Sequence, residues 1–126
     1  MKQFRESKRF CDSNPGKKIF GDRPQEDNGR RLEPQIRVDL GTTLVIGLIV
    51  RRVSRNSEPL VAPVAFLLHP TFMQPVLYAQ GDGDSARVKI SPSGWFTVVA
   101  IIDDGNTILS YDLNKLPNAP QWFKEN

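Results

Sequence analysis

Short apolar stretches, separated by clusters of turn residues, follow one another along the chain after Pro34. From Ile36 to Leu40 apolar and polar residues alternate, and this period of two predicts a strand with one buried face. The run Thr43–Val50 is continuously apolar and rich in β-branched residues, which predicts a central strand covered on both faces. No segment has the period of a convincing amphipathic helix.

The rest of the chain repeats this pattern. Further strands are expected over Val61–Leu68, Val76–Ala79, Ala86–Ile90, Trp95–Ile102 and Thr107–Leu113. The cluster Asp103–Asn106 predicts a hairpin, because Asp, Asn and Gly tolerate the positive φ that tight turns need. This spacing of short strands predicts an all-β fold, an immunoglobulin-like antiparallel β-sandwich of about seven to eight strands, with a small barrel as the alternative.

The N-terminal end differs in composition from the strand-rich part. Residues 1–33 are polar and carry isolated apolar positions such as Phe4, Phe10 and Phe20. They are expected to form a flexible or loosely docked N-terminal arm, outside a folded domain formed by residues 34–126.

The C-terminal end combines two prolines with two aromatic residues. Pro117 and Pro120 predict that no regular helix forms here. Trp122 and Phe123 favour burial, so this segment is expected to lie back on the sandwich.

Charge is unevenly distributed along the 126 residues, whose net charge is +3. Residues 1–59 hold thirteen Lys and Arg against eight Asp and Glu, a balance of +5, whereas residues 60–126 hold four against six, a balance of −2. A basic half can bind nucleic acid. Its charges are mixed in sign along the sequence, which favours a solvated surface, so nucleic acid is not the expected partner.

The remaining features indicate a cytoplasmic protein. The longest apolar run is too short to span a bilayer, and the N-terminus has no apolar signal region, so no membrane association is expected. Cys11 is the only cysteine, which excludes an intramolecular disulfide and fits a reducing compartment. The sequence does not determine the oligomeric state.

Catalytic chemistry is poorly supported by the residues present. The one histidine, His69, has only Cys11 as a thiol partner, and nothing nearby orients such a pair, so an enzyme is not expected. Asp82, Asp84, Asp103 and Asp104 could hold a hard cation, but acidic turn residues more often serve the turn itself. Neither a metal nor another cofactor is expected.

Two aromatic-bearing loops are the candidate binding site. Both His69–Phe72 and Ser93–Phe96 lie at expected strand ends, where rigid sheets present binding residues. If the loops meet at one pole, Phe72 and Trp95 can form a slot for a flat or cationic group. The alternative is that these rings cap the core and His69 is satisfied within its turn.

These loops resemble the two signatures of YEATS domains. The stretch Phe66–Val76 resembles the family's F-x-L-H-P-[ST]-[FY]-x-x-P motif, and Ser93–Val98 resembles its Gly-Trp signature. The segments Asp103–Thr107 and Tyr111–Leu113 are most similar to the prokaryotic branch, often called pYEATS. The resemblance covers about residues 61–123.

The resemblance implies an immunoglobulin-like sandwich that reads acylated lysine between aromatic rings. By motif, Phe72 and Trp95 would be the ring walls, Thr71 the hydroxyl that holds the acyl carbonyl, and His69 the pocket histidine. Gly94 would be the position of close approach. Phe96, which directly follows Trp95, would crowd the open end of the slot.

The expected function is a non-enzymatic module that binds a protein or peptide partner, with acylated lysine as a candidate ligand. A bacterial conflict or signalling system is a candidate setting that the resemblance implies. One alternative is a structural adaptor that uses a sheet edge or the N-terminal arm. A weaker alternative is nucleic-acid binding through the basic N-terminal half.

Overall fold

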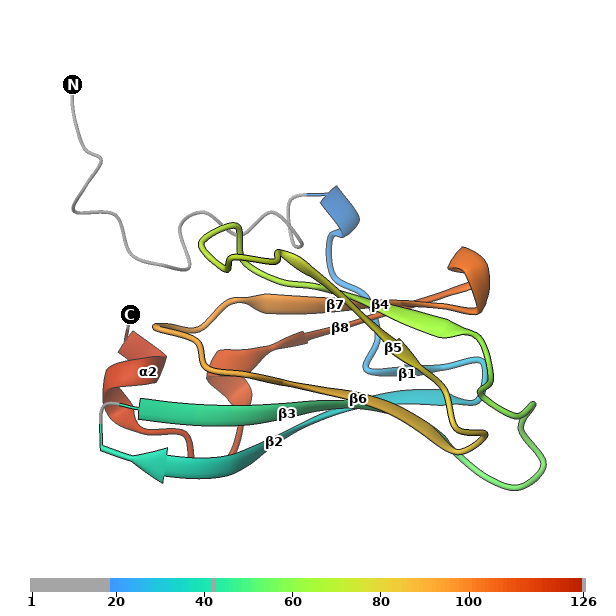
Figure 1. Ribbon diagram of the computed structural model, residues 1–126, viewed down its shortest axis with the longest axis horizontal. Helices are drawn as coiled ribbons and strands as arrows, with labels where there is room; N and C mark the ends of the chain where they lie inside the picture. The colour runs from blue at the N-terminus through green and yellow to red at the C-terminus, as the bar shows by residue number, and fades with distance from the viewer. Residues whose placement is uncertain (1–18, 42, 126) are drawn as a thin grey trace.

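A computed structural model describes residues 19–41 and 43–125, and the predictions that concern Phe4, Phe10 and Cys11 lie outside this part of the chain. Two antiparallel four-stranded sheets are stacked face to face (Figure 1). The elements are β1 (Glu26–Asp27), β2 (Arg30–Leu40), β3 (Thr43–Arg52), β4 (Pro63–Leu67), β5 (Val76–Gln80), β6 (Ser85–Ile90), β7 (Thr97–Ile102), η2 (Asp103–Gly105), β8 (Thr107–Asp112), η3 (Leu113–Lys115) and α2 (Gln121–Glu125).

The strand order confirms the predicted β-sandwich. One sheet has the order β1-β2-β3-β6 and the other the order β5-β4-β7-β8, so the chain crosses between the sheets three times after β3. The hairpins β2–β3, β4–β5 and β7–β8 are each antiparallel within one sheet. None of the helices in the described part of the chain is long and apolar enough to cross a membrane.

The core lies between the two sheets and is built by alternate residues of the central strands. On β3, Leu44, Ile46, Leu48 and Val50 are at most 1% exposed and belong to one core cluster. The residues of β7 that join this cluster are Val98, Ala100 and Ile102. The strands expected over Thr43–Val50 and Trp95–Ile102 therefore supply much of the interior. Burial of this apolar surface is the main stabilising contribution to the fold.

The predicted alternation of β2 is wrong at its end. Ile36 packs against the core, but Val38 and Leu40 are 42% and 72% exposed. The register between β2 and β3 shifts between Ile36 and Val38, and such a bulge changes the face to which later residues point. Beyond this shift the β2–β3 hairpin also extends past the paired part of β6.

The expected domain boundary between residues 33 and 34 falls inside β2. Residues 23–33 join the two sheets: the N–H of Ser110 on β8 donates to the carbonyl of Pro24, and the N–H of Leu32 donates to that of Gln25. β1 then pairs with the start of β2. The sandwich therefore begins earlier in the sequence than the composition change indicates.

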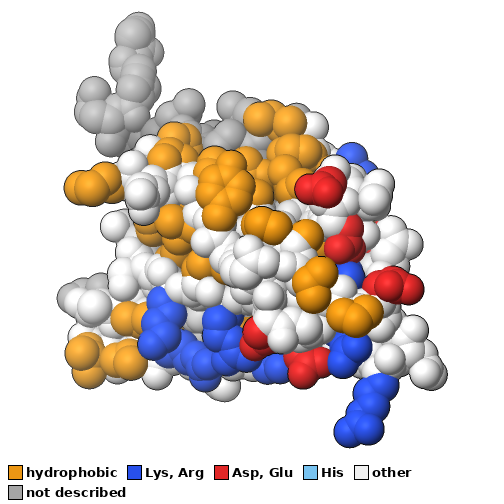
Figure 2. All heavy atoms as spheres, turned by 45° about the vertical axis from the view of Figure 1, so that its right-hand side comes forward, with side chains coloured by type: hydrophobic (Ala, Val, Ile, Leu, Met, Phe, Trp, Pro, Cys, Tyr) orange, Lys and Arg blue, Asp and Glu red, His pale blue; other side chains and the backbone are white. Residues whose placement is uncertain are grey.

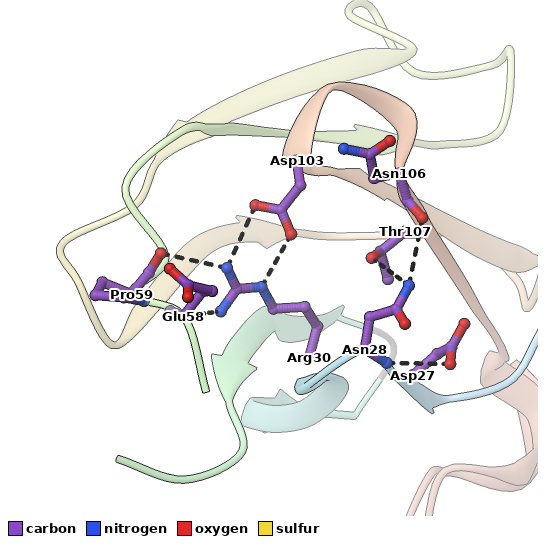
Figure 3. Close-up of polar contacts among 8 residues, drawn as sticks. All are labelled: Asp27, Asn28, Arg30, Glu58, Pro59, Asp103, Asn106 and Thr107. Carbon is purple, nitrogen blue, oxygen red and sulfur yellow. Dashed lines mark hydrogen bonds and ion pairs between the residues drawn. The ribbon is translucent and has the colours of Figure 1, made fainter. Parts of the chain in front are cut away.

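The buried side chain of Arg30 connects this polar segment to the rest of the fold. Its side chain is 2% exposed, and its guanidinium contacts both carboxylate oxygens of Asp103, at 3.1 and 3.3 Å (Figure 3). It also donates to the carbonyls of Glu58 and Pro59. A buried guanidinium must have such partners, because desolvating an unpaired charge is very unfavourable.

Asn28 makes a second connection between the same two regions. Its side-chain amide donates to Thr107 Oγ1 at 3.0 Å and to the carbonyl of Asn106 at 3.4 Å (Figure 3). The turn before β2 is thus fixed to the β7–β8 hairpin. That hairpin is the predicted one, and Asp103, Asp104 and Gly105 adopt the positive φ values of 52°, 56° and 94°.

The C-terminal segment packs on the sandwich as predicted, although it includes a short helix that was not expected. Phe123 is fully buried in the core and Trp122 packs against it. α2 begins directly after Pro120, whose carbonyl accepts hydrogen bonds from the N–H groups of Phe123 and Lys124. Proline is tolerated at a helix start, because the first N–H groups have no partner within the helix.

Candidate functional site

The loop between β4 and β5 is closed by its own backbone. The N–H of Leu68 donates to the carbonyl of Pro75 at 2.7 Å, and the N–H of Phe72 donates to that of His69 at 3.1 Å. A tight turn therefore carries the candidate residues 69–72 at the strand end. Met73, at its tip, is 99% exposed.

His69 is held within this turn rather than presented to solvent, since it is only 3% exposed. The backbone N–H of Thr71 donates to His69 Nδ1 at 3.2 Å, which requires that Nδ1 carries no proton. The hydroxyl of Thr71 lies 2.9 Å from the same nitrogen and must therefore be the donor. The Thr71 oxygen is left with lone pairs that can accept a hydrogen bond.

The loop between β6 and β7 meets this turn through Phe96. That ring is 1% exposed and packs edge-on against Phe72, with 5.7 Å between the centroids. It also meets the His69 ring at 6.2 Å. Edge-to-face geometry at these distances is favourable, so Phe96 fixes both candidate rings. The expectation that the two loops meet at one pole agrees with this geometry.

In the part of the chain that the structure describes, the ring contacts at this pole do not include a direct contact between the two rings expected to form the slot. Among the described residues no ring contact joins Phe72 to Trp95, and Phe72 is paired instead with Phe96. Trp95 is partly buried and packs against the core cluster, while Gly94 is buried. The buried Phe96 ring thus supports the Phe72 ring from inside the fold.

Two adjoining hollows mark the surface of this pole. The first has a volume of about 320 Å³ and is lined by Thr71, Phe72, Ser91 and Ser93. The second, of about 250 Å³, includes Ser91 and Ser93 again, together with Trp122 of α2. We call the first hollow the polar cleft. Its volume is at the lower end of the range for small-ligand sites, and each of the side chains that line it is uncharged.

Sequence reasoning did not single out Ser91 or Trp122, and it included Ser93 only as the first residue of the candidate loop Ser93–Phe96. The cluster Ser91–Gly94 is recognisable as a turn, but nothing in it distinguishes a lining hydroxyl from a turn residue. Trp122 is placed by a contact 81 positions away, since its indole N–H donates to the carbonyl of Gly41 at 2.8 Å. No local pattern contains such a contact.

The acidic turn residues have structural roles. Asp82 Oδ1 accepts the N–H groups of Asp84 and Ser85, at 2.9 and 2.8 Å. These bonds, that from Ser85 first, lower the pKa of the Asp82 carboxyl below its usual range. Asp103 pairs with Arg30, as described above. Within residues 19–41 and 43–125, no three His, Cys, Asp or Glu side chains come together where they could hold a metal ion.

Comparison with known proteins places the chain in a family. The family model of the prokaryotic YEATS domain matches residues 45–114, which is more than half of the chain and includes both loops of the site. No curated protein and no solved structure matched the chain in the corresponding comparisons. The all-β sandwich agrees with the immunoglobulin-like fold of this family. The chain therefore belongs to the prokaryotic YEATS domain family.

Proposed function

We propose that this protein is a non-enzymatic module that binds a peptide segment of a partner protein at the polar cleft. The observation that supports this most is the cleft's composition, which combines one aromatic ring with three hydroxyls and no charged side chain. Such a lining suits a neutral, flat, polar group. An ammonium ion would lose hydration here without a carboxylate to replace it.

The amide of an acylated lysine is the group that best fits this description. Its N–H would donate to Thr71 Oγ1, because the hydroxyl proton is already donated to His69 Nδ1. This role is the reverse of the one implied by family resemblance, where the hydroxyl holds the acyl carbonyl. The Ser91 hydroxyl is the candidate donor for that carbonyl, and Phe72 would cover the flat face of the amide.

Titration of acetyl-lysine, crotonyl-lysine and unmodified lysine peptides tests this proposal. The intact protein should prefer the acylated peptides. Thr71→Val keeps the shape and removes one acceptor, so affinity for them should fall roughly two- to twelvefold, the equivalent of one hydrogen bond. Equal affinity for acylated and unmodified peptides would exclude acylated lysine as the ligand.

The edge of the second sheet supports a second candidate, a structural adaptor. β5 is an edge strand, and Tyr78 and Val76 on it are 72% and 36% exposed. An extended partner segment can add to such an edge through main-chain hydrogen bonds. Tyr78→Ala is therefore the matched control for Phe72→Ala. Loss of partner binding in Phe72→Ala alone supports the polar cleft, whereas loss in Tyr78→Ala alone supports the edge.

A further inference from the structure

A second concave surface lies on the outer face of the sheet that contains β2, β3 and β6, and it shares no lining residue with the polar cleft. Its volume is about 300 Å³, and it is lined by Arg37, Gly47, Ile49, Arg87, Val88 and Lys89. We call it the basic trough. Lys and Arg side chains gather along the lower side of Figure 2, the side on which Figure 1 draws β2 and β3.

The strand register explains the shape of this trough. Gly47 pairs with Lys89 and Ile49 pairs with Arg87, so β6 places two cations along one side of β3. Arg37 rises from β2 on the other side, where a Cβ on Gly47 would lie 3.1 Å from its Nε. The central strand therefore forms a low floor between cationic walls. Glycine inside a strand often marks a place where a ligand approaches the backbone.

No acidic side chain lines the trough, although the Asp82 carboxylate lies near enough to Arg87 for the two charges to interact. In the described part of the chain, Arg37, Arg87 and Lys89 make no ion pair, and the guanidinium of Arg87 donates to Ser85 Oγ at 3.0 Å. Glu33 is the acid on the same face, and it already contacts Arg31 at 3.3 Å and Arg51 at 2.5 Å. Three cations thus face a hollow that no carboxylate lines.

We infer that the basic trough binds the phosphate groups of a phosphorylated ligand. Three cations around one small hollow match a compact group with more than one negative charge, and a phosphate monoester carries about −1.5 to −2. The guanidinium of an arginine can donate two parallel hydrogen bonds to two oxygens of one phosphate. A peptide carboxylate carries one charge, and the floor strand has no free main-chain groups for a peptide, because β3 is paired on both sides.

Free nucleotides and the end of a nucleic-acid strand share this phosphate chemistry. Calorimetric titration with tripolyphosphate, adenosine triphosphate and a 5′-phosphorylated thymidine octamer distinguishes these sources. Tightest binding of the octamer, with a steep salt dependence, assigns the trough to a strand end. Comparable binding of tripolyphosphate and adenosine triphosphate assigns it to free phosphate compounds. Hexaglutamate is the probe for a general acidic ligand.

Lys89→Gln should weaken binding of these phosphate probes roughly ten- to hundredfold, as expected for a lost hydrogen bond to a charged group. Lys124→Gln on α2 removes the same charge outside the trough and should leave binding unchanged. Gly47→Ala adds one methyl group to the floor without changing the charge, and should also weaken binding. Circular dichroism checks that each variant is folded.

Three results would overturn the inference. One is that no phosphate probe binds the intact protein at low salt. Another is that Lys124→Gln weakens binding as much as Lys89→Gln, which would show attraction to net charge alone. The third is that hexaglutamate binds as tightly as tripolyphosphate. None of these results depends on the acyl-peptide titrations, so this inference and the proposed function can fail separately.

Discussion

At the scale of single residues, Arg30 connects parts of the chain that are far apart in the sequence. It reaches 73 positions along the chain to Asp103 and also donates to two backbone carbonyls of the loop before β4. Sequence reasoning assigned it to an arm, because its neighbours are polar. A charged residue in a polar segment gives no local sign of partners far away in the sequence. The burial of the Arg30 side chain could therefore not be predicted.

Arg30→Ala should lower the free energy of unfolding by roughly 3 kcal/mol, because it leaves a carboxylate and two carbonyls without their donor. Arg31→Ala is the matched control, since the Arg31 side chain is 40% exposed and surface ion pairs contribute at most about 1 kcal/mol. Urea denaturation of the two variants measures both values. Equal and small losses would contradict the structural role of Arg30.

Asp82 makes stability depend on pH in a defined direction. Its pKa is lowered in the folded state, so its contribution to stability is present above the unfolded pKa of about 3.9 and is lost as pH falls through the folded pKa. Asp82→Asn should therefore be less stable than the intact protein at pH 7. The difference should shrink below pH 4, because the protonated carboxyl is also uncharged. Denaturant titrations at several pH values test this, and a difference that is constant down to pH 3 would contradict it.

At the scale of elements, period and turn chemistry predicted most strands and the β7–β8 hairpin. The face on which Val38 and Leu40 lie was missed, because a bulge between two strands depends on their mutual register and not on either sequence alone. The helix α2 was missed because proline was read as excluding a helix, although it only prevents one from continuing through it. The first error concerns information outside the local pattern, whereas the second was a misreading of a local signal.

For the candidate site, the sequence indicates where the loops lie but not which contacts form between them. Residues 69–72 and 94–96 could be placed in two loops, since turn residues mark where strands end, but that they bind a ligand stays a prediction. The contact between Phe72 and Phe96 could not be predicted, because it depends on how the core packs. The hydroxyls of Ser91 and Ser93 enter the cleft only once both loops are in place.

At the scale of the whole molecule, the sandwich is closed along one side by the segment that precedes β2. Residues 23–25 bond to β8 and to β2, and thereby connect an edge strand of one sheet to the second strand of the other. Residues 23–33 therefore belong to the domain. Within this segment, Leu32 contributes a buried side chain to the core.

Truncation at residue 34 or at Ile19 tests where the domain begins. A chain that begins at residue 34 lacks Arg30, Leu32 and the bonds of residues 23–25, and should lose its cooperative thermal transition. A chain that begins at Ile19 keeps every contact described here and should unfold cooperatively. Scanning calorimetry measures both, and a transition within a few degrees of the intact protein for the shorter chain would contradict the extended domain.

The proposal that the polar cleft binds a peptide is tested most directly by mapping where a ligand contacts the protein. Backbone amide signals should be followed by nuclear magnetic resonance during titration with an acetyl-lysine peptide. The proposal predicts that the largest shifts occur at Thr71, Phe72, Ser91 and Ser93, with little change on β5. Shifts concentrated on Val76–Gln80, or no shifts at a saturating peptide concentration, would contradict it.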